Sequence, residues 1–477
     1  MTRSLALSAL ILCAPAFAAP DAPAAPSDPA AAPTTPQAEP IAAPAPATSG
    51  RNVIFFHPDG MGLNTWTAAR LHTVGPDGTL AWDQLPHVGI YRGHMKDSLV
   101  ASSNGAATIH AYGVKVPAKS YGMHGRKPLT AASGFKGSVA EEAIAKGIAV
   151  GVVNTGHIAE PGTGCFLASV EARSQADEIA KQVIRSGATV ILSGGEQFLL
   201  PAGTAGTHGF GTRNDDLNLI EEARELGYTV VFSRDELLAL KPTPETKLLG
   251  VFAHGHTFND QPHADLKSAQ LPLYAPEAPT IAEMTQVALD VLSQHTQGFL
   301  LIAEEEATDN FGNANNPNGV LEAAARSDKA IATASQFIDN QPNTLLLVAS
   351  DSDAGGLQLL TIAPPSPFAF KPGSKIPQRT ANGTTLHGVD GSGSTPFESK
   401  PDAQGNSMYF GLAFATRADL PSGLLVRAKG ANAESLPLNF DNTDIYHMIH
   451  NTLFDLPEAE EAPASSDTAA PATTPER

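Results

Sequence analysis

Short apolar runs alternate along the chain with longer amphipathic segments. The short runs are typical of strands buried on both faces, and the amphipathic segments space their apolar residues as a helix covering a sheet does. We expect strands at residues 53–56, 148–153, 189–192, 229–232, 299–302, 345–348 and 357–362. We expect helices at residues 176–185, 217–226, 281–292, 320–338 and 445–454. The alternation predicts an α/β fold, a three-layer α/β/α sandwich around a large, mostly parallel central sheet.

Residues 1–19 follow a different pattern. Arg3 precedes an apolar run over 5–12, and the small-residue sequence Ala16-Phe17-Ala18 comes next. This order is typical of a secretory signal peptide, and the run is too short to span a bilayer. It predicts a periplasmic or secreted protein, and the alternative is an N-terminal helix of the fold.

Two further segments lack the alternation. Residues 20–50 are nearly all Ala, Pro, Ser and Thr, and residues 457–477 combine Glu with the same small residues. Such compositions bury too little apolar area to offset the entropy of ordering. We therefore expect a disordered linker at 20–50, one large folded domain at 51–456 and a disordered acidic tail at 457–477. Within the domain, the Gly-, Pro- and Ser-rich composition of residues 364–407 predicts a long ordered excursion of the chain, and not a separate domain.

The charge balance narrows the classes of partner. The 30 basic side chains face 49 acidic ones, for a formal net charge of −19. A field of this sign opposes binding to nucleic acid or to anionic lipid. An anionic small molecule would meet the same obstacle unless cations reversed the charge locally. With Cys13 in the expected leader, Cys165 is the one mature thiol, so we expect no intrachain disulfide.

Acidic residues follow three of the expected strands. Asp59 comes after 53–56, Glu304 after 299–302 and Asp351 after 345–348. Because ligands of open α/β sheets bind beyond the carboxyl ends of the strands, we expect these carboxylates to converge. Clustered carboxylates repel one another unless cations lie between them, which predicts divalent metals. The alternative is that each is a helix cap or a turn former.

Hydroxyl groups precede a small-residue segment at Ser102-Ser103-Asn104-Gly105. If a helix begins there, its positive end favours an anion and activates a serine nucleophile. An ordinary helix cap is the alternative.

Several ordered motifs carry a family resemblance. Asn-Val-Ile-Phe-Phe-His-Pro-Asp-Gly-Met-Gly spans 52–62, Gly-Phe-Leu-Leu-Ile-Ala-Glu spans 298–304, and Asp-Asn-Thr-Asp-Ile spans 441–445. Together they resemble the alkaline phosphatases over essentially all of 51–456. The resemblance implies the three-layer fold, hydrolysis of phosphate monoesters through a phosphoserine, and a site for two Zn²⁺ and one Mg²⁺.

The resemblance also assigns roles to residues. Ser103 falls on the phosphorylated serine, with Asn104 beside it as a substrate contact, and Arg173 falls on the arginine that grips the phosphoryl oxygens. A guanidinium fork suits that role because it can hold two oxygens at once. The metal ligands that the resemblance implies are Asp59, Glu304, Asp309 and Asp351, with Glu160 and Thr163 near the third metal.

The chain departs from the family at the zinc-ligating histidines, which are replaced by Asn313, Ser352 and Ala415. Ser102 stands where the family commonly has the aspartate that orients the arginine. The remaining ligands then form an oxygen-only set of Asp59, Glu304, Asp309, Asn313 and Asp351, with Ser352 beside it. Such a set suits Mg²⁺, Ca²⁺ or Mn²⁺ better than Zn²⁺. Other histidines that could replace the lost ligands include His157, His254, His256 and His387, each of which we expect on the surface or in the core.

The expected function is that of a secreted, metal-dependent alkaline phosphatase acting on small phosphorylated metabolites. Its cofactors would be two to three divalent ions: Mg²⁺, with Zn²⁺ or Ca²⁺/Mn²⁺ at the two catalytic positions. We expect no nucleic-acid binding and no membrane span, and a homodimer is compatible with the sequence. The alternatives are a phosphodiesterase or sulfatase of the same superfamily and an inactive phosphate- or metal-binding homologue. A pure binder has no need of a nucleophile, and no Cys-x-Pro-x-Arg sequence supports a sulfatase.

Overall fold

A ten-stranded sheet forms the centre of the computed structural model, which describes residues 51–362 and 373–454. Its strand order is β19-β2-β18-β10-β1-β9-β5-β6-β8-β7. In chain order its strands are β1 (Asn52–Pro58), β2 (His87–Arg92), β5 (Ala149–His157), β6 (Val190–Gly194), β7 (Tyr228–Val231), β8 (Lys247–Val251), β9 (Phe299–Glu305), β10 (Thr344–Val348), β18 (Leu424–Gly430) and β19 (Asn439–Asp441).

The central sheet is mostly parallel, as the sequence predicted. From β10 through β1, β9, β5, β6 and β8 to β7, every neighbouring pair is parallel. Only β18 runs against its neighbours, β10 and β2. The register sets Phe56 of β1 beside Ala303 of β9 and Val348 of β10, so these three central strands end together.

Helices cover both faces of this sheet. They are α1 (Leu63–Thr73), α2 (Ser103–Tyr112), α3 (Val139–Ala145), α4 (Pro161–Gly164), α5 (Ala176–Arg185), α6 (Leu219–Glu225), α7 (Arg234–Leu238), α8 (His263–Ala269), α9 (Ile281–Leu292), α10 (Ala307–Asn313), α11 (Pro317–Asn340) and α12 (Asp444–Phe454).

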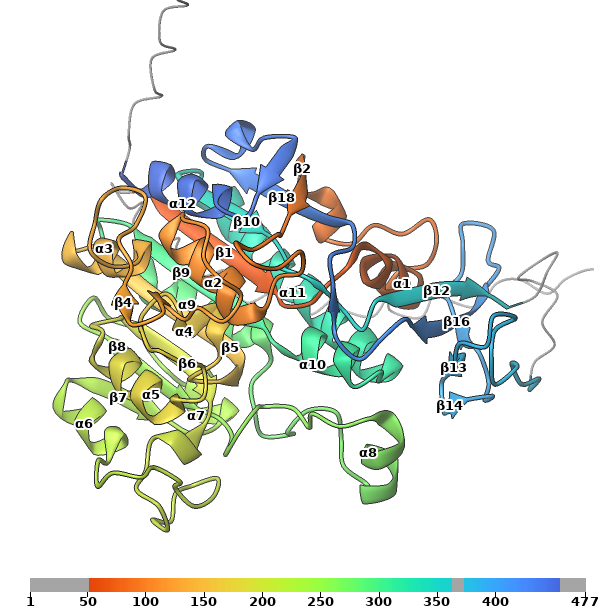
Figure 1. Ribbon diagram of the computed structural model, residues 1–477, viewed down its shortest axis with the longest axis horizontal. Coiled ribbons are helices and arrows are strands. Elements are labelled where there is room, and N and C mark those ends of the chain that lie inside the picture. Colours follow the sequence, from red (N-terminus) through yellow and green to blue (C-terminus); the bar gives the residue numbers. More distant parts are fainter. Residues whose placement is uncertain (1–50, 363–372, 455–477) are drawn as a thin grey trace, which may run out of the picture. The chain divides into compact units, whose positions relative to one another are not determined.

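Alternation along the strands produces two cores (Figure 1). Val53 and Phe55 of β1 pack into the core that α2, α3, α5, α6 and α12 cover. Ile54 and Phe56 point the other way, into the core that α1, α7, α9 and α11 cover. Successive residues of a strand face opposite sides of a sheet, so a strand made of an unbroken apolar run is buried on both faces.

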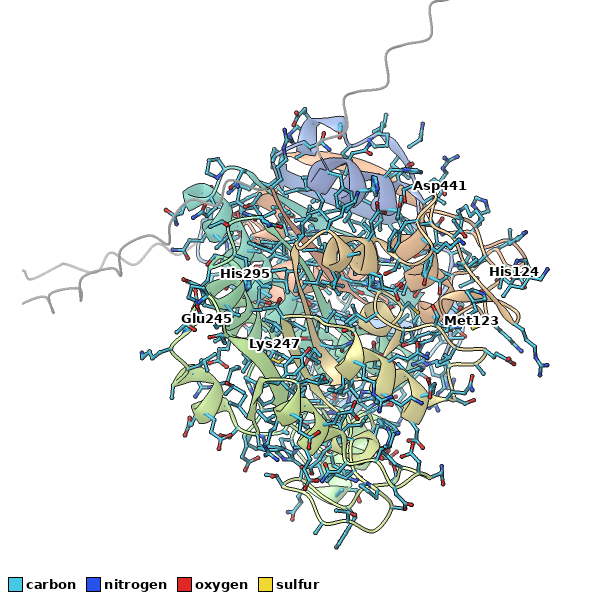
Figure 2. The ribbon with its side chains drawn as sticks, turned by 90° about the vertical axis from the view of Figure 1, so that its left-hand side faces the viewer. Met123, His124, Glu245, Lys247, His295 and Asp441 are labelled. Atoms are coloured by element: carbon cyan, nitrogen blue, oxygen red, sulfur yellow. The ribbon has the colours of Figure 1, made fainter. Side chains whose placement is uncertain are left out.

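The ends of the parallel strands define two rims of the sheet, which Figure 2 shows on opposite sides of the view. Lys247 begins β8 and His295 precedes β9, so both mark the amino-terminal rim. Asp441 ends β19 at the carboxyl-terminal rim, where Met123 and His124 also lie in this view. Ligands of parallel sheets bind beyond the carboxyl-terminal rim.

The expected strand at 357–362 is a strand, but it does not belong to the central sheet. It is β12 (Leu357–Thr361), which pairs antiparallel with β16 (Tyr409–Phe414) in a second, five-stranded sheet. Only Leu357 of β12 is buried, because this sheet covers a smaller core of its own. The remaining short strands are β3 (Met123–His124), β4 (Lys127–Pro128), β11 (Asp353–Ala354), β13 (His387–Gly388), β14 (Gly391–Ser392), β15 (Phe397–Glu398) and β17 (Asp419–Leu420).

The expected excursion at 364–407 therefore contributes β13, β14 and β15 to the second sheet, apart from residues 363–372, which lie outside the described residues. The expected leader and linker, 1–50, and the acidic tail also lie outside them. Residues 51–362 and 373–454 fall within one compact unit. None of the described helices combines the length and apolar character needed to cross a membrane.

Truncation of a central core side chain tests this packing. Leu301 of β9 is 0% exposed, so we expect Leu301→Ala to lower the free energy of unfolding by about 2–5 kcal/mol, because it removes buried methyl groups and leaves a cavity. Leu438 is 67% exposed, and Leu438→Ala should change the same free energy by about 0.5 kcal/mol or less. Urea unfolding of both variants measures the difference, and equal destabilisation would contradict the assigned packing.

Candidate functional site

Three buried carboxylates meet at the carboxyl-terminal rim. Asp59 follows β1, Glu304 lies near the end of β9 and Asp351 follows β10. Their exposed fractions are 0%, 0% and 2%. Since these strands are neighbours in register, the pairing of the strands is what brings the carboxylates together.

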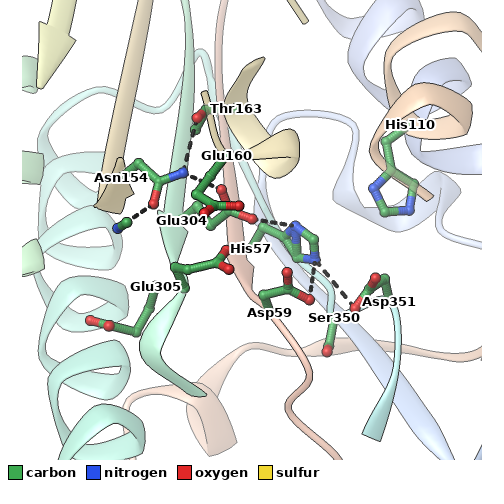
Figure 3. A network of polar contacts seen from close by, with 12 residues as sticks. His57, Asp59, His110, Asn154, Glu160, Thr163, Glu304, Glu305, Ser350 and Asp351 are labelled. Carbon is green, nitrogen blue, oxygen red and sulfur yellow. Dashed lines mark hydrogen bonds and ion pairs between the residues drawn. The ribbon is translucent and has the colours of Figure 1, made fainter. Parts of the chain in front are cut away.

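His57 lies at the centre of this group, and Figure 3 shows its imidazole between the three carboxylates. Its Nε2 is 3.9 Å from Asp59 Oδ1 and 3.8 Å from Asp351 Oδ1, and its Nδ1 is 3.8 Å from Glu304 Oε1. These separations are too long for hydrogen bonds. They suit ligand atoms that share a cation about 2 Å from each of them. Burial lowers the pKa of His57 to about 4, so the ring is neutral.

The residues present fit divalent metals. Within the described part of the chain, buried atoms of this group have no hydrogen-bond partner: His57 Nδ1 and Nε2, both oxygens of Asp59, Glu304 Oε1, Glu306 Oε2 and Asp351 Oδ2. Burial and the charges of Asp351 and Asp309 raise the pKa of Asp59 well above its usual range. Burial and neighbouring carboxylates also raise the pKa values of Glu304 and Glu306. Carboxylates in this position can all ionise only if cations compensate them.

The acidic side chains of Glu304, Glu305 and Glu306, at the end of β9, point alternately to opposite sides. Glu304 and Glu306 join Asp59 in a group whose ligand atoms lie within 4.8 Å of one another. Glu305 faces away and accepts hydrogen bonds from the hydroxyls of Thr155 (2.7 Å) and Tyr274 (3.1 Å). Burial raises the pKa of Glu305 to about 7. Glu306 is thus a candidate ligand that the sequence reasoning did not select.

A turn at Gly60 brings Asp309 of α10 close to Asp59. Gly60 has a φ of +66°, and a Cβ there would lie 2.8 Å from Asp309 Oδ1. Loss of exposure to water, together with the charge of Asp419, raises the pKa of Asp309. Only a residue without a side chain permits this approach.

Asn313 does not face the cluster as the expected oxygen ligand. Its Nδ2 donates to Asp309 Oδ1 (3.1 Å) and to Asp419 Oδ1 (2.9 Å), while its Oδ1 accepts from the N–H of Gly355 at 3.1 Å. Reversing the amide would set oxygen against carboxylate oxygens, so the orientation is determined by its partners. Asn313 therefore bridges two carboxylates in this structure instead of offering an oxygen to a metal.

Asp419, and not Ala415, lies beside the carboxylate cluster. Ala415 is exposed and its N–H donates to Gly355 O, whereas Asp419 lies against Asn313 and Asp309. Asp419 reaches this place because β17 pairs with β11, next to Asp351. Asp419 is a second candidate ligand that the sequence reasoning missed.

Ser352 and Thr163 occupy different surroundings. The Ser352 hydroxyl is buried beside Asp351 and has no hydrogen-bond partner among the described residues. It is therefore available to bind a metal or to hydrogen-bond to a metal ligand. The Thr163 hydroxyl accepts a 3.0 Å hydrogen bond from Asn154, which also donates to Glu304. Thr163 therefore contacts the cluster through Asn154.

The serine pair begins α2 as expected, and its two hydroxyls differ. Ser102 is the N-cap: its Oγ accepts from Gly105 N (3.3 Å) and donates to Ala118 O. Ser103, the first helical residue, is 7% exposed, and among the described residues its hydroxyl makes no capping hydrogen bond like that of Ser102. The side chain of Asn104 donates to Ser120 O at 3.0 Å, so its amide nitrogen supports the loop after α2.

Arg173 is held by a carboxylate that the sequence reasoning had assigned to a metal. The guanidinium lies on a loop before α5, is half-exposed, and contacts Glu160 Oε2 at 2.7 Å. Glu160 is thus the carboxylate that holds the guanidinium in this structure, while Ser102 caps α2. Although burial opposes the effect, the charges of Glu160, Glu306 and Asp59 raise the pKa of Arg173. The positive charge of Arg173 therefore interacts favourably with the carboxylates of the cluster.

The four histidines expected on the surface or in the core divide into two kinds. The Nε2 of His254 donates to Phe210 O at 2.9 Å, and His387 lies in the second sheet. His157 and His256 instead contact Glu160. Burial lowers the pKa of His256 to about 4.

Comparisons with known proteins show what the chain as a whole resembles. A family model described as alkaline phosphatase matches residues 50–453. The chain is 28% identical to the membrane-bound alkaline phosphatase of Bombyx mori over 64% of this chain and 60% of that protein. It is 26% identical to the alkaline phosphatase of Escherichia fergusonii over 87% and 89%. The chain thus spans about three fifths of the length of its insect relative and most of its bacterial one.

A solved structure confirms the fold. The alkaline phosphatase from the Antarctic bacterium TAB5 superposes with a TM-score of 0.63 at 20% identity, over 85% of this chain and 98% of that chain. A variant of that enzyme was solved with Mg bound in its M3 site. At this identity, the likeness establishes the α/β sandwich alone.

Proposed function

Because the chain belongs to the alkaline phosphatase family, we propose that this phosphatase hydrolyses phosphate monoesters through a phosphoserine at Ser103 and depends on divalent metals. One observation carries the proposal. Buried carboxylates and His57, without partners among the described residues, gather at the carboxyl-terminal rim within the electrostatic reach of Arg173. A structural network of this size would pair its polar atoms, whereas a metal centre leaves them for the ions.

The ligands divide into groups that share Asp59. His57, Asp59 and Asp351 form one, and Asp59, Glu304 and Glu306 form another. Asp309 and Asp419 adjoin them, with Asn313 as the bridge. The sequence alone suggested an oxygen-only ligand set, to which His57 adds a nitrogen. Zn²⁺ is therefore a candidate ion again, together with Mg²⁺, Mn²⁺ and Ca²⁺. When bound, two or three such ions would activate the serine hydroxyl and neutralise charge on the attacking and leaving oxygens.

The residues of the chain then perform two successive displacements. The Ser103 Oγ forms a bond to phosphorus while the bond from phosphorus to the alcohol oxygen breaks, and the alcohol leaves with a proton. Water next attacks the phosphoserine, which releases inorganic phosphate and restores the Ser103 hydroxyl. Arg173, oriented by Glu160, would hold two phosphoryl oxygens, and the N-terminus of α2 adds positive potential.

The remaining expectations accompany this proposal. Arg173 is half-exposed, which suits phosphate groups on small metabolites that approach from solvent. Export to the periplasm or medium rests on the signal-like sequence of residues 1–19. The acidic net charge does not oppose an anionic substrate where cations reverse the sign of the local field.

Removal of metals tests the proposal. We expect chelation to reduce hydrolysis of a chromogenic phosphate monoester by about a hundred-fold or more, because the cluster loses its Lewis acids. Adding Zn²⁺, Mg²⁺, Mn²⁺ and Ca²⁺ singly and in pairs should restore turnover, while circular dichroism reports whether the fold persists. Absence of turnover with every metal would overturn the proposal. Faster hydrolysis of a phosphate diester or a sulfate ester in the same assay would redirect it to another hydrolase of the superfamily.

A further inference from the structure

A second group of metal-ligating side chains lies on the other side of Glu160. His157 ends β5, Glu160 precedes α4, and His256 lies in the loop after β8. His157 Nε2 is 2.9 Å from Glu160 Oε1, and His256 Nε2 is 3.8 Å from the same oxygen. One ligand atom from each residue lies within 4.8 Å of the other two. Glu160 itself is 2% exposed, while both rings are partly open to solvent.

Two ring nitrogens are directed at one oxygen of Glu160, whereas an ion pair with this oxygen needs only one. A single hydrogen bond from His157 would satisfy Glu160 Oε1, yet His256 directs a second ring nitrogen toward this oxygen from beyond hydrogen-bond distance. Ligand atoms that share a tetrahedral ion at about 2.0–2.1 Å are separated by roughly these distances. These three residues therefore offer three ligand atoms of a tetrahedral set, and a solvent molecule would be the fourth ligand.

Packing holds both imidazoles in place. The ring of His157 lies 4.9 Å from that of Phe198, and the ring of His256 lies 4.9 Å from that of Phe258, between ring centroids. The two imidazoles are themselves 4.9 Å apart. Aromatic neighbours of this kind limit rotation of the ligands.

We infer that His157, Glu160 and His256 form a separate site for a transition-metal dication, and that this ion positions Arg173 through the shared carboxylate. Two imidazoles and one carboxylate select Zn²⁺, Mn²⁺, Fe²⁺ or Co²⁺ over Mg²⁺ and Ca²⁺, which prefer oxygen. The main cluster, with one imidazole among several carboxylates, is richer in oxygen and suits Mg²⁺ or Ca²⁺ as well as Zn²⁺. The two sites are thus chemically distinct although they adjoin.

The link to Arg173 follows from the two oxygens of Glu160. Oε1 faces the imidazoles, and Oε2 contacts the guanidinium at 2.7 Å. An ion on Oε1 would fix the plane of the carboxylate and with it the direction of the guanidinium fork. The inference that the ion positions Arg173 rests on the proposed function, in which Arg173 binds the phosphoryl oxygens.

Metal content tests the site directly. Full-length protein, His256→Ala, His157→Gln and their double variant are stripped, dialysed against Zn²⁺ and measured by mass spectrometry. We expect each single variant and the double variant to retain one equivalent of Zn²⁺ less than the parent. His254→Ala is the matched control, since His254 lies in the same loop but contacts Phe210 O; it should retain the parent's content. Equal content in all five proteins would overturn the inference.

Phosphate binding tests the link to Arg173 without relying on turnover. Calorimetric titration with inorganic phosphate should show an affinity about ten-fold lower in His256→Ala than in the parent, and no further loss when His256→Ala is added to Arg173→Lys. Additive losses would show that the site, if loaded, does not act through the arginine. A parent protein that binds Zn²⁺ at the triad but hydrolyses no ester would refute the proposed function and leave the metal site intact.

Discussion

Ser103→Ala is expected to reduce hydrolysis of phosphate monoesters by about a thousand-fold or more while leaving fold and metal content unchanged. The change removes one hydroxyl from the first residue of α2, which keeps its N-cap at Ser102. Without the Ser103 Oγ, no covalent phosphoenzyme can form, and only direct attack by water remains. Steady-state kinetics measure the loss, and acid quenching of the enzyme with radiolabelled substrate measures the phosphoserine.

Ser102→Ala is the matched control. Its hydroxyl caps α2 and donates to Ala118 O, so the variant should lose about 1 kcal/mol of stability yet still form the phosphoenzyme. The reverse result, with Ser102→Ala inactive and Ser103→Ala active, would assign the nucleophile to Ser102. Full activity in both variants would show that water attacks the substrate directly.

Asp59→Asn should lower the activity of the metal-loaded protein and raise the stability of the metal-free protein. We expect activity to fall by about a hundred-fold or more, because Asp59 is shared between two ligand groups. We also expect the stripped variant to be more stable than the stripped parent at neutral pH. Burial and the charges of Asp351 and Asp309 raise the pKa of Asp59, so its ionised form opposes folding when no cation is bound.

The sign of the pH dependence follows from that raised pKa. A carboxyl whose pKa is higher in the folded protein than in the unfolded one contributes stability below its unfolded pKa, and that contribution is lost as pH rises through the folded value. The stripped parent should therefore approach the variant in stability as pH falls. Urea unfolding with and without metal, at several pH values, measures both effects.

Glu305→Gln provides the comparison for Asp59→Asn. Glu305 is also fully buried and adjoins the cluster in sequence, but it bonds to Thr155 and Tyr274. The variant should retain metal content and activity. If both variants lose metal equally, proximity to the cluster, and not direct ligation by Asp59, would explain the effect.

Much of the fold was predictable because strands buried on both faces appear as continuous apolar runs. The expected helices at 176–185 and 281–292 coincide with α5 and α9. The expected strands at 53–56, 299–302 and 345–348 lie within β1, β9 and β10. β2 and β18 were missed because β2 alternates exposed and buried residues and β18 alternates partly buried and buried ones, which is a weaker signal than a continuous apolar run.

The candidate site was predictable only in part. Strand-end carboxylates are visible in a sequence, since a strand and its end are local features. His57 is not, because within an apolar run it is indistinguishable from a core residue until β9 and β10 are set beside β1. Asp419 depends on the pairing of β17 with β11, and neither two-residue strand has a periodic signal of its own.

The sequence by itself determined the α/β class, the strand-end carboxylates and the serine at a helix start, because each depends on residues close together in the chain. Tertiary structure alone decided which side chains complete the site. It set His57 among three carboxylates, turned Asn313 into a bridge, and joined Glu160 to Arg173 on one side and to two histidines on the other. These contacts join residues whose separation in sequence carries no information about their distance in space, which the strand order and the loops at the rim determine.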